Sequence, residues 1–187
     1  MISLSFLFEN KVLDFPTSRQ DNKLSCGSSV VQSILAYYGI DERQDDLHKD
    51  LAVSKDGISY KNIIKKFKKH KLTPDAGTMS LDMIKEYIDN NYPVIILIQA
   101  YKDNNNKKPY TVDDYKDGHY VIVIGYDDQN LVVEDPSLNN KLGYIPLEEL
   151  DVRWHGYGET KEEKLDHFGI AVVGEIKHLP NEVTKVE

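Results

Sequence analysis

The sequence predicts an α+β fold in which an N-terminal helical part packs on a C-terminal antiparallel β-sheet. Three observations lead to this prediction. Apolar residues recur at helical spacing within residues 15–90, whereas apolar runs rich in β-branched residues occupy residues 91–177. No linker-like segment separates the two parts. We therefore expect a single domain over residues 1–187.

The N-terminal half contains the segments with helical patterns. The stretch CGSSVVQSILAYYG has apolar residues three or four positions apart and ends at Gly39, a residue that often follows a helix. Two later segments begin at Ser59 and Ser80, and serine is a good helix N-cap. The expected helices are residues 26–39, 41–51, 59–70 and 80–90, after a short strand at residues 2–8.

The C-terminal half changes to strand patterns. Two apolar runs, 119–126 and 131–136, flank a short polar turn, which predicts a β-hairpin. A polar loop, 102–118, precedes them. The remaining expected elements are strands at 93–101 and 167–176, and a short strand followed by a helical turn within 142–150.

Charge and hydropathy exclude several functions. The net charge of −8 argues against nucleic acid as a partner, because phosphate contacts require a basic face. The one basic run, 61–71, fits the solvated face of an amphipathic helix. No apolar run approaches the roughly 18 residues needed to span a membrane. A lone cysteine and the lack of a signal-peptide pattern predict a cytoplasmic protein.

The only cysteine, Cys26, stands at the start of the first expected helix. Free backbone N–H groups and the helix dipole favour a thiolate at this position, which makes Cys26 a candidate nucleophile. The glycine that follows, Gly27, would allow a substrate to approach the backbone closely.

A thiol nucleophile needs a base, and the base needs a group that orients it. The histidines are His48, His70, His119, His155, His167 and His178. His119 is preferred, because the hairpin that follows it returns a carboxylate, Asp135. His167 is the second choice, since it also begins a strand but has only Glu175 nearby.

The hairpin turn decides whether His119 and Asp135 share a face of the sheet. A three-residue loop, 127–129, would place Asp135 opposite Val121 and diagonal to His119, within side-chain reach. A strict two-residue turn would place the two side chains on opposite faces. They share a face only with an odd-length loop or a bulge between Tyr126 and Leu131, and the sequence leaves the choice of turn open.

Gln20 is a candidate for a third task. Attack on a carbonyl group creates an oxyanion, which requires hydrogen-bond donors. The Gln20 amide, six residues before Cys26, and the backbone N–H of the nucleophile are suitable donors.

The segments Q…CGSSVVQSILAYYG and GHYVIVIGYDDQNLVVEDPS resemble the papain-like cysteine peptidases. The resemblance is strongest to the bacteriocin-processing peptidases, which cleave leader peptides after a double glycine. It implies a papain-like fold, a peptide or protein substrate, and no cofactor or metal. It also implies that Cys26 is the nucleophile, His119 the general base and acid, Asp135 the group that orients His119, and Gln20 the oxyanion donor. Ser25 departs from the acidic residue that this family often carries there.

Three other functions remain open from the sequence. Cys26, His119 and Asp135 could bind zinc, although no fourth ligand is evident. The fold could bind a peptide without cleaving it, although relatives that do so lack the cysteine. The same thiol could also transfer its acyl group to an amine rather than to water.

Overall fold

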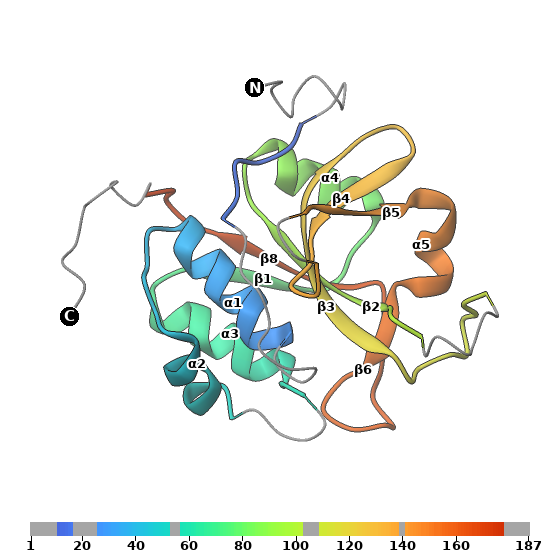
Figure 1. The fold of residues 1–187 in the computed structure, drawn as a ribbon, viewed down its shortest axis with the longest axis horizontal. Helices are drawn as coiled ribbons and strands as arrows, with labels where there is room; N and C mark the ends of the chain where they lie inside the picture. Colours follow the sequence, from blue (N-terminus) through green and yellow to red (C-terminus); the bar gives the residue numbers. More distant parts are fainter. Residues whose placement is uncertain (1–10, 17–25, 53–56, 103–108, 139–140, 178–187) are drawn as a thin grey trace.

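The computed structural model describes residues 11–16, 26–52, 57–102, 109–138 and 141–177. It shows the predicted α+β architecture, built on a six-stranded antiparallel sheet with strand order β1-β8-β2-β3-β4-β5 (Figure 1). The strands are β1 (Thr73–Thr78), β2 (Val94–Gln99), β3 (Gly118–Tyr126), β4 (Asn130–Glu134), β5 (Gly143–Pro146) and β8 (Phe168–Val173). A separate two-stranded ribbon consists of β6 (His155–Tyr157) and β7 (Lys164–Asp166). The strand expected at residues 2–8 lies outside the described residues.

The four predicted helices are present with slightly shorter bounds, and the helical turn within 142–150 is a fifth. They are α1 (Cys26–Tyr37), α2 (Gln44–Asp50), α3 (Tyr60–Lys69), α4 (Leu81–Asp89) and α5 (Leu147–Arg153). The serine caps form as predicted: Ser59 Oγ accepts the Lys61 N–H at 3.1 Å, and Ser80 Oγ accepts the Met83 N–H at 3.2 Å. In the described part of the chain, no helix has the length and apolar character needed to cross a membrane.

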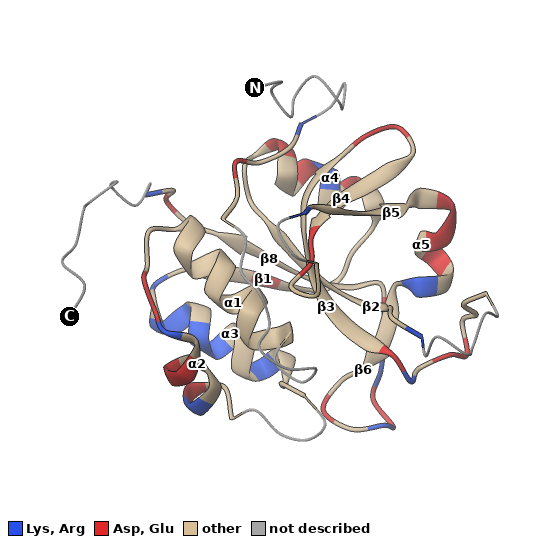
Figure 2. Cartoon of the chain, viewed as in Figure 1, with Lys and Arg blue, Asp and Glu red and all other residues tan. Residues whose placement is uncertain are grey.

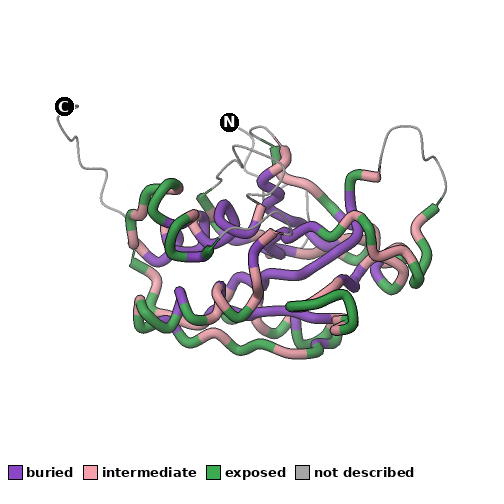
Figure 3. The backbone as a smooth tube through the Cα atoms, turned by 90° about the horizontal axis from the view of Figure 1, so that it is seen from below, coloured by how far each residue is buried: buried purple, intermediate pink, exposed green. Residues whose placement is uncertain are grey.

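The helices cover different parts of the sheet. Helices α1, α2 and α3 gather on one side of the molecule, and α5 lies on the opposite side next to β5 (Figure 1). Helix α1 packs against β3, and α4 packs against β2 and β3. Buried backbone runs through the middle of the molecule, and exposed segments lie toward its outside (Figure 3). The central strand β2 lies between β8 and β3, and its six residues are all buried. Apolar side chains on both faces of this strand explain why its sequence is continuously hydrophobic.

Strands β1, β6 and β7 depart from the sequence-based expectation. The β1 segment, TPDAGT, is polar and contains proline and glycine, so it has no strand pattern of its own. Among the described strands it pairs with β8 alone and is the outermost, a position where proline is tolerated and exposure is expected. The three-residue β6 and β7 are too short to show any periodicity.

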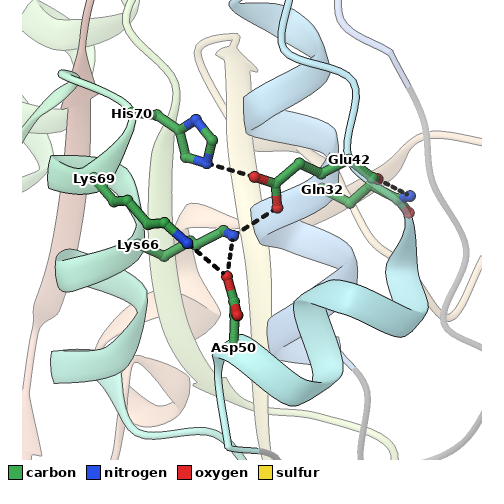
Figure 4. A network of polar contacts seen from close by, with 6 residues as sticks. All are labelled: Gln32, Glu42, Asp50, Lys66, Lys69 and His70. Atoms are coloured by element: carbon green, nitrogen blue, oxygen red, sulfur yellow. Dashed lines mark hydrogen bonds and ion pairs between the residues drawn. The ribbon is translucent and has the colours of Figure 1, made fainter.

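The basic run of α3 is partly neutralised by acidic residues near α2 (Figure 2). The buried side chain of Lys66 reaches Glu42 at 2.6 Å and Asp50 at 2.7 Å, and His70 Nε2 lies 2.6 Å from the other Glu42 oxygen (Figure 4). The apolar face of the same helix buries Ile63 and Phe67. This arrangement agrees with the expected amphipathic helix, although Lys66 is buried instead of solvated.

Candidate active site

Cys26 is the first residue of α1, and its thiol is partly buried against the core. Because α1 packs against β3, the sulfur lies beside the start of that strand. The backbone N–H groups of Gly27 and Tyr120 and the side chain of His119 lie near the sulfur, and each lowers the pKa of the thiol. The thiol is thus held between a helix N-terminus and a strand that carries a histidine.

Gly27 has a packing role that differs from the expected one. A Cβ atom at this position would lie 3.0 Å from Cβ of Ile58, closer than most carbon–carbon contacts. The space beside Gly27 is therefore filled by Ile58 and is not open to a substrate. The glycine lets α1 approach the segment that leads into α3.

His119 and Asp135 are buried side chains that meet across the hairpin. His119 is the second residue of β3 and lies opposite Ile98 of β2. Asp135 directly follows β4. Nε2 of His119 lies 2.8 Å from Oδ1 of Asp135, a hydrogen-bonding distance. Because Nε2 is occupied, the nitrogen of the ring that remains for Cys26 is Nδ1.

The hairpin does not use the three-residue loop that would explain this contact. Tyr126 pairs with Leu131 instead of Asn130, and the Asp127 N–H donates to the Asn130 carbonyl at 2.9 Å. These pairings leave a two-residue turn, Asp128 and Gln129. With a regular ladder, such a turn would place His119 and Asp135 on opposite faces.

A β-bulge restores the shared face. Val123 pairs with Val133, but Gly125 pairs with Val132, so Ile124 is an extra residue on β3. Beyond the bulge, toward the open end of the hairpin, each residue of β4 pairs one position earlier on β3 than it would in a regular ladder. Asp135 consequently lies on the same face of the sheet as His119.

The bulge is held by the segment Lys11–Leu13. The Leu13 N–H donates to the Ile124 carbonyl at 2.8 Å, and Val12 forms an isolated bridge with Gly125. A Cβ atom at Gly125 would lie 2.7 Å from the Lys11 carbonyl oxygen, so only glycine permits this approach. The glycine in the motif VIGY thus marked a feature that strand periodicity did not reveal.

Asp135 accepts hydrogen bonds on both carboxylate oxygens. Oδ1 accepts from His119 and from the Ser137 N–H at 2.9 Å, and Oδ2 accepts from the Tyr101 hydroxyl at 2.6 Å. Tyr101 also contacts His119 directly, with ring centroids 5.2 Å apart and an interplanar angle of 87°. Tyr101 is a site residue that sequence reasoning missed, because it appeared only as the end of an apolar strand.

The contacts shift the pKa values of all three groups. Burial raises the pKa of the Cys26 thiol, but the hydrogen bond and positive charge of His119 outweigh burial and leave this pKa below its ordinary value. Burial lowers the pKa of His119, but its bonds to Asp135 and Cys26 raise it to about 9. Burial also raises the pKa of Asp135, and the hydrogen bonds from His119 and Tyr101 hold it below its ordinary value. The site therefore favours a thiolate beside an imidazolium.

The other described histidines lie in different surroundings. His167 packs its ring on Trp154 and lies 3.6 Å from Asp151, so it does not take the place beside Cys26. His155 lies 2.8 Å from the Asp114 carbonyl oxygen and contacts aromatic rings. His70 joins the Glu42 network.

Gln20, the expected oxyanion donor, lies outside the described residues. The zinc hypothesis finds no support in the arrangement of the proposed ligands. His119 stands between the other two, with Asp135 on Nε2 and Cys26 beside the rest of the ring, so the three side chains do not converge. Within the described ranges, no group of three or more His, Cys, Asp or Glu side chains is arranged to hold a metal ion.

A family model and several solved structures are similar to this chain. The model of the Peptidase_C39 like family matches residues 12–162. A search of curated proteins finds no match.

Solved structures of peptidase domains share the fold. A double glycine motif protease from an AMS/PCAT transporter, in complex with its leader peptide, is 20% identical with a TM-score of 0.60, covering 86% of this chain and 92% of that chain. The peptidase domain of Streptococcus ComA, a bi-functional ABC transporter, is 20% identical with a TM-score of 0.58, covering 84% and 97%. A C39-like peptidase from Bacillus anthracis is 15% identical with a TM-score of 0.68, covering 90% and 99%. At these identities the likeness concerns the fold.

Proposed function

The chain belongs to the Peptidase_C39 like family and is a cysteine peptidase, and from this premise we propose that it cleaves a leader peptide after a double glycine. In this proposal Cys26 is the nucleophile, His119 the general base and acid, and Asp135 the group that orients His119. Gln20 contributes an oxyanion donor, as the family resemblance implies. No cofactor is needed for this chemistry.

The observation that carries the proposal is the linked set of contacts from Cys26 through His119 to Asp135. The thiol lies at a helix N-terminus and interacts with His119, whose Nε2 bonds Asp135 at 2.8 Å. The pKa of the thiol is lowered and that of the imidazole is raised, as an ion pair between them requires.

The first half-reaction forms a thioester. The Cys26 thiolate attacks the carbonyl carbon of the scissile peptide bond, and the carbonyl oxygen becomes an oxyanion that backbone N–H groups at the start of α1 and the Gln20 amide stabilise. The tetrahedral intermediate then collapses with cleavage of the C–N bond. The His119 imidazolium gives its proton to the leaving amine, so the amine departs neutral.

The second half-reaction regenerates the thiol site. Neutral His119 takes a proton from water, and the resulting hydroxide attacks the thioester carbonyl. The C–S bond breaks, the acid product leaves, and the proton on His119 again pairs with the Cys26 thiolate. Asp135 stabilises the imidazolium at each stage and keeps Nε2 turned away from the sulfur.

The substrate class is inferred from the family and from a relative. One structure with the same fold is described as a double glycine motif protease bound to a leader peptide. The net charge of −8 favours a neutral or basic peptide over an acidic one.

The proposal is tested with synthetic peptides in which a leader-like helical segment is followed by Gly-Gly and then by a short cargo sequence. Cleavage after the second glycine, followed by mass spectrometry, is expected for the wild-type chain and for His167→Ala, and none for Cys26→Ala. A peptide with Gly-Gly changed to Val-Val should resist cleavage. Equal cleavage of both peptides would reject the double-glycine specificity. Binding without cleavage would instead indicate a non-catalytic module, and product joined to an added amine would indicate acyl transfer.

A further inference from the structure

Tyr101 is the second residue after the end of β2 and has an unusual backbone conformation. Its φ angle is +59°, in the left-handed region that bulky side chains rarely adopt. Such a conformation persists only where surrounding contacts enforce it, and it occurs preferentially at functional sites. The position of Tyr101 therefore calls for a specific explanation.

The backbone is fixed on both sides of Tyr101. The Ala100 N–H donates to the Asp117 carbonyl at 2.9 Å, and the Lys102 N–H donates to the Tyr110 hydroxyl at 3.2 Å. The Lys102 ammonium forms an ion pair with Asp114 and also lies over the ring of Tyr110. These contacts hold the chain in the conformation that turns the Tyr101 side chain toward the hairpin.

The side chain touches both members of the hydrogen-bonded pair. Its hydroxyl donates to Asp135 Oδ2 at 2.6 Å, while Oδ1 of the same carboxylate bonds His119. Its ring meets the imidazole of His119 at 87°, with centroids 5.2 Å apart. Aromatic rings attract one another in this edge-to-face geometry. One tyrosine thus restrains the carboxylate and the imidazole together.

A cavity on the other side of Asp135 makes this restraint important. It has a volume of about 310 Å³, and its lining includes Tyr101, Asp135, Val133, Tyr144 and Arg153. Water in this space can reach Asp135, because this residue is part of the lining. Tyr101 lines this cavity and also contacts His119, and 54% of its surface is exposed.

We propose that Tyr101 is a positioning residue that fixes the orientation of Asp135 and His119 and limits the access of water to the bond between them. Because the Tyr101 hydroxyl binds Oδ2 of Asp135, Oδ1 is the oxygen that faces Nε2 of His119. The Tyr101 ring prevents the imidazole from tilting away from Cys26. This inference rests on the proposed function for its kinetic consequence. Its consequence for thiol reactivity is independent of any substrate.

The test compares Tyr101→Phe, Tyr101→Leu and a matched control, Tyr126→Phe. Tyr126 is a suitable control because its hydroxyl also donates to a carboxylate, Asp89 at 2.8 Å, at the far end of β3. For each variant, the rate of Cys26 alkylation by iodoacetamide is measured over the pH range in which thiols and imidazoles titrate. The kcat and KM for a cleaved peptide are measured in parallel, and circular dichroism checks the fold.

We expect Tyr101→Leu to lower kcat by about tenfold or more, with KM unchanged, because the ring and the hydroxyl are both lost. Its alkylation midpoint should move to higher pH, since water in the cavity weakens the interaction between imidazolium and thiolate. Tyr101→Phe, which keeps the ring, should lie between Tyr101→Leu and the wild type. Tyr126→Phe should match the wild type in every measurement.

Three outcomes would overturn the inference. Wild-type kcat and alkylation in both Tyr101 variants would mean that the contacts have no positioning effect. A raised KM with unchanged kcat would mean that Tyr101 contacts the substrate instead. An alkylation profile in the wild type like that of a free thiol would reject the whole site. If no peptide is cleaved but the alkylation midpoints still differ as expected, the proposed function fails and the positioning role stands. If Tyr101→Leu does not fold, Tyr101→Phe decides.

Discussion

The Nε2 atom of His119 lies 2.8 Å from Oδ1 of Asp135 because an extra residue, Ile124, interrupts the regular pairing between them. The two residues are sixteen positions apart and are joined by a hairpin with a two-residue turn. In a regular ladder with that turn, the imidazole and the carboxylate would face opposite sides of the sheet. The bulge therefore has a direct chemical consequence, since it creates the pair that is proposed to activate Cys26.

The first prediction concerns the glycine at this bulge. Gly125→Ala should destabilise the chain by about 1–3 kcal/mol, because the new Cβ would meet the Lys11 carbonyl and displace the segment that covers the bulge. Gly77→Ala in β1 is the control, since a Cβ there meets nothing within 4 Å. Urea unfolding measures both changes. Equal effects of the two substitutions would contradict the prediction.

Much of the fold could be predicted from local patterns. The helix caps at Ser59 and Ser80 and the continuous apolar run of β2 were all read from neighbouring residues. Their physical causes are local, since a cap needs one side chain and a buried central strand needs an unbroken apolar run. Strand β1 could not be predicted, because its place in the sheet comes from pairing with β8, about a hundred residues later.

The contact between His119 and Asp135 could be predicted from the sequence, but the geometry that produces it could not. His119 and Asp135 were selected because the hairpin brings them together, and the structure does place them in contact. The sequence left the turn open, and the required change of parity comes neither from an odd-length loop nor from a bulge between Tyr126 and Leu131, but from a bulge at Ile124 within β3. Tyr101 was missed because its role depends on a left-handed backbone angle and on side chains distant in sequence. The spacing of apolar residues along the sequence does not reveal such contacts.

The second prediction concerns the buried cation between α2 and α3. Lys66→Met should destabilise the chain by roughly 1–3 kcal/mol, because it leaves the Glu42 and Asp50 carboxylates without their shared partner. Lys65→Met, an exposed neighbour in the same helix, should have little effect. Urea unfolding near neutral pH compares them. A loss no larger than that of Lys65→Met would show that the network contributes no net stability.

The third prediction uses the opposite pKa shifts of Cys26 and His119. Alkylation of Cys26 needs only the thiolate. Its rate should therefore rise with pH and reach a plateau at a lower pH than for a thiol with an ordinary pKa. Peptide hydrolysis also needs the protonated imidazole to release the amine, and His119 has a pKa of about 9. Hydrolysis should therefore fall as pH rises through about 9, whereas alkylation should not.

His119→Ala provides the control for this third prediction. Without the imidazolium, burial dominates, so the pKa of the Cys26 thiol should rise and alkylation near neutral pH should become slow. His167→Ala should leave both profiles unchanged, because His167 lies beside Trp154 and Asp151. Slow alkylation in His167→Ala with a normal rate in His119→Ala would reverse the assignment.

The fourth prediction separates the charge of Asp135 from its geometry. Asp135→Ala should lower kcat by roughly 10²–10⁴-fold, because His119 loses the acceptor that fixes its ring and stabilises its charge. Asp135→Asn should retain more activity, since an amide oxygen can still accept a hydrogen bond from Nε2. The lost charge should lower the pKa of His119, so hydrolysis should fall at a lower pH than in the wild type.

The control is Asp127→Asn, at the other end of the hairpin, where the carboxylate accepts hydrogen bonds from backbone N–H groups of the turn. Steady-state kinetics across pH, with melting temperatures to confirm folding, distinguishes these variants. If Asp135→Ala keeps full turnover while Asp127→Asn loses it, the carboxylate that supports His119 has been assigned to the wrong end of the hairpin.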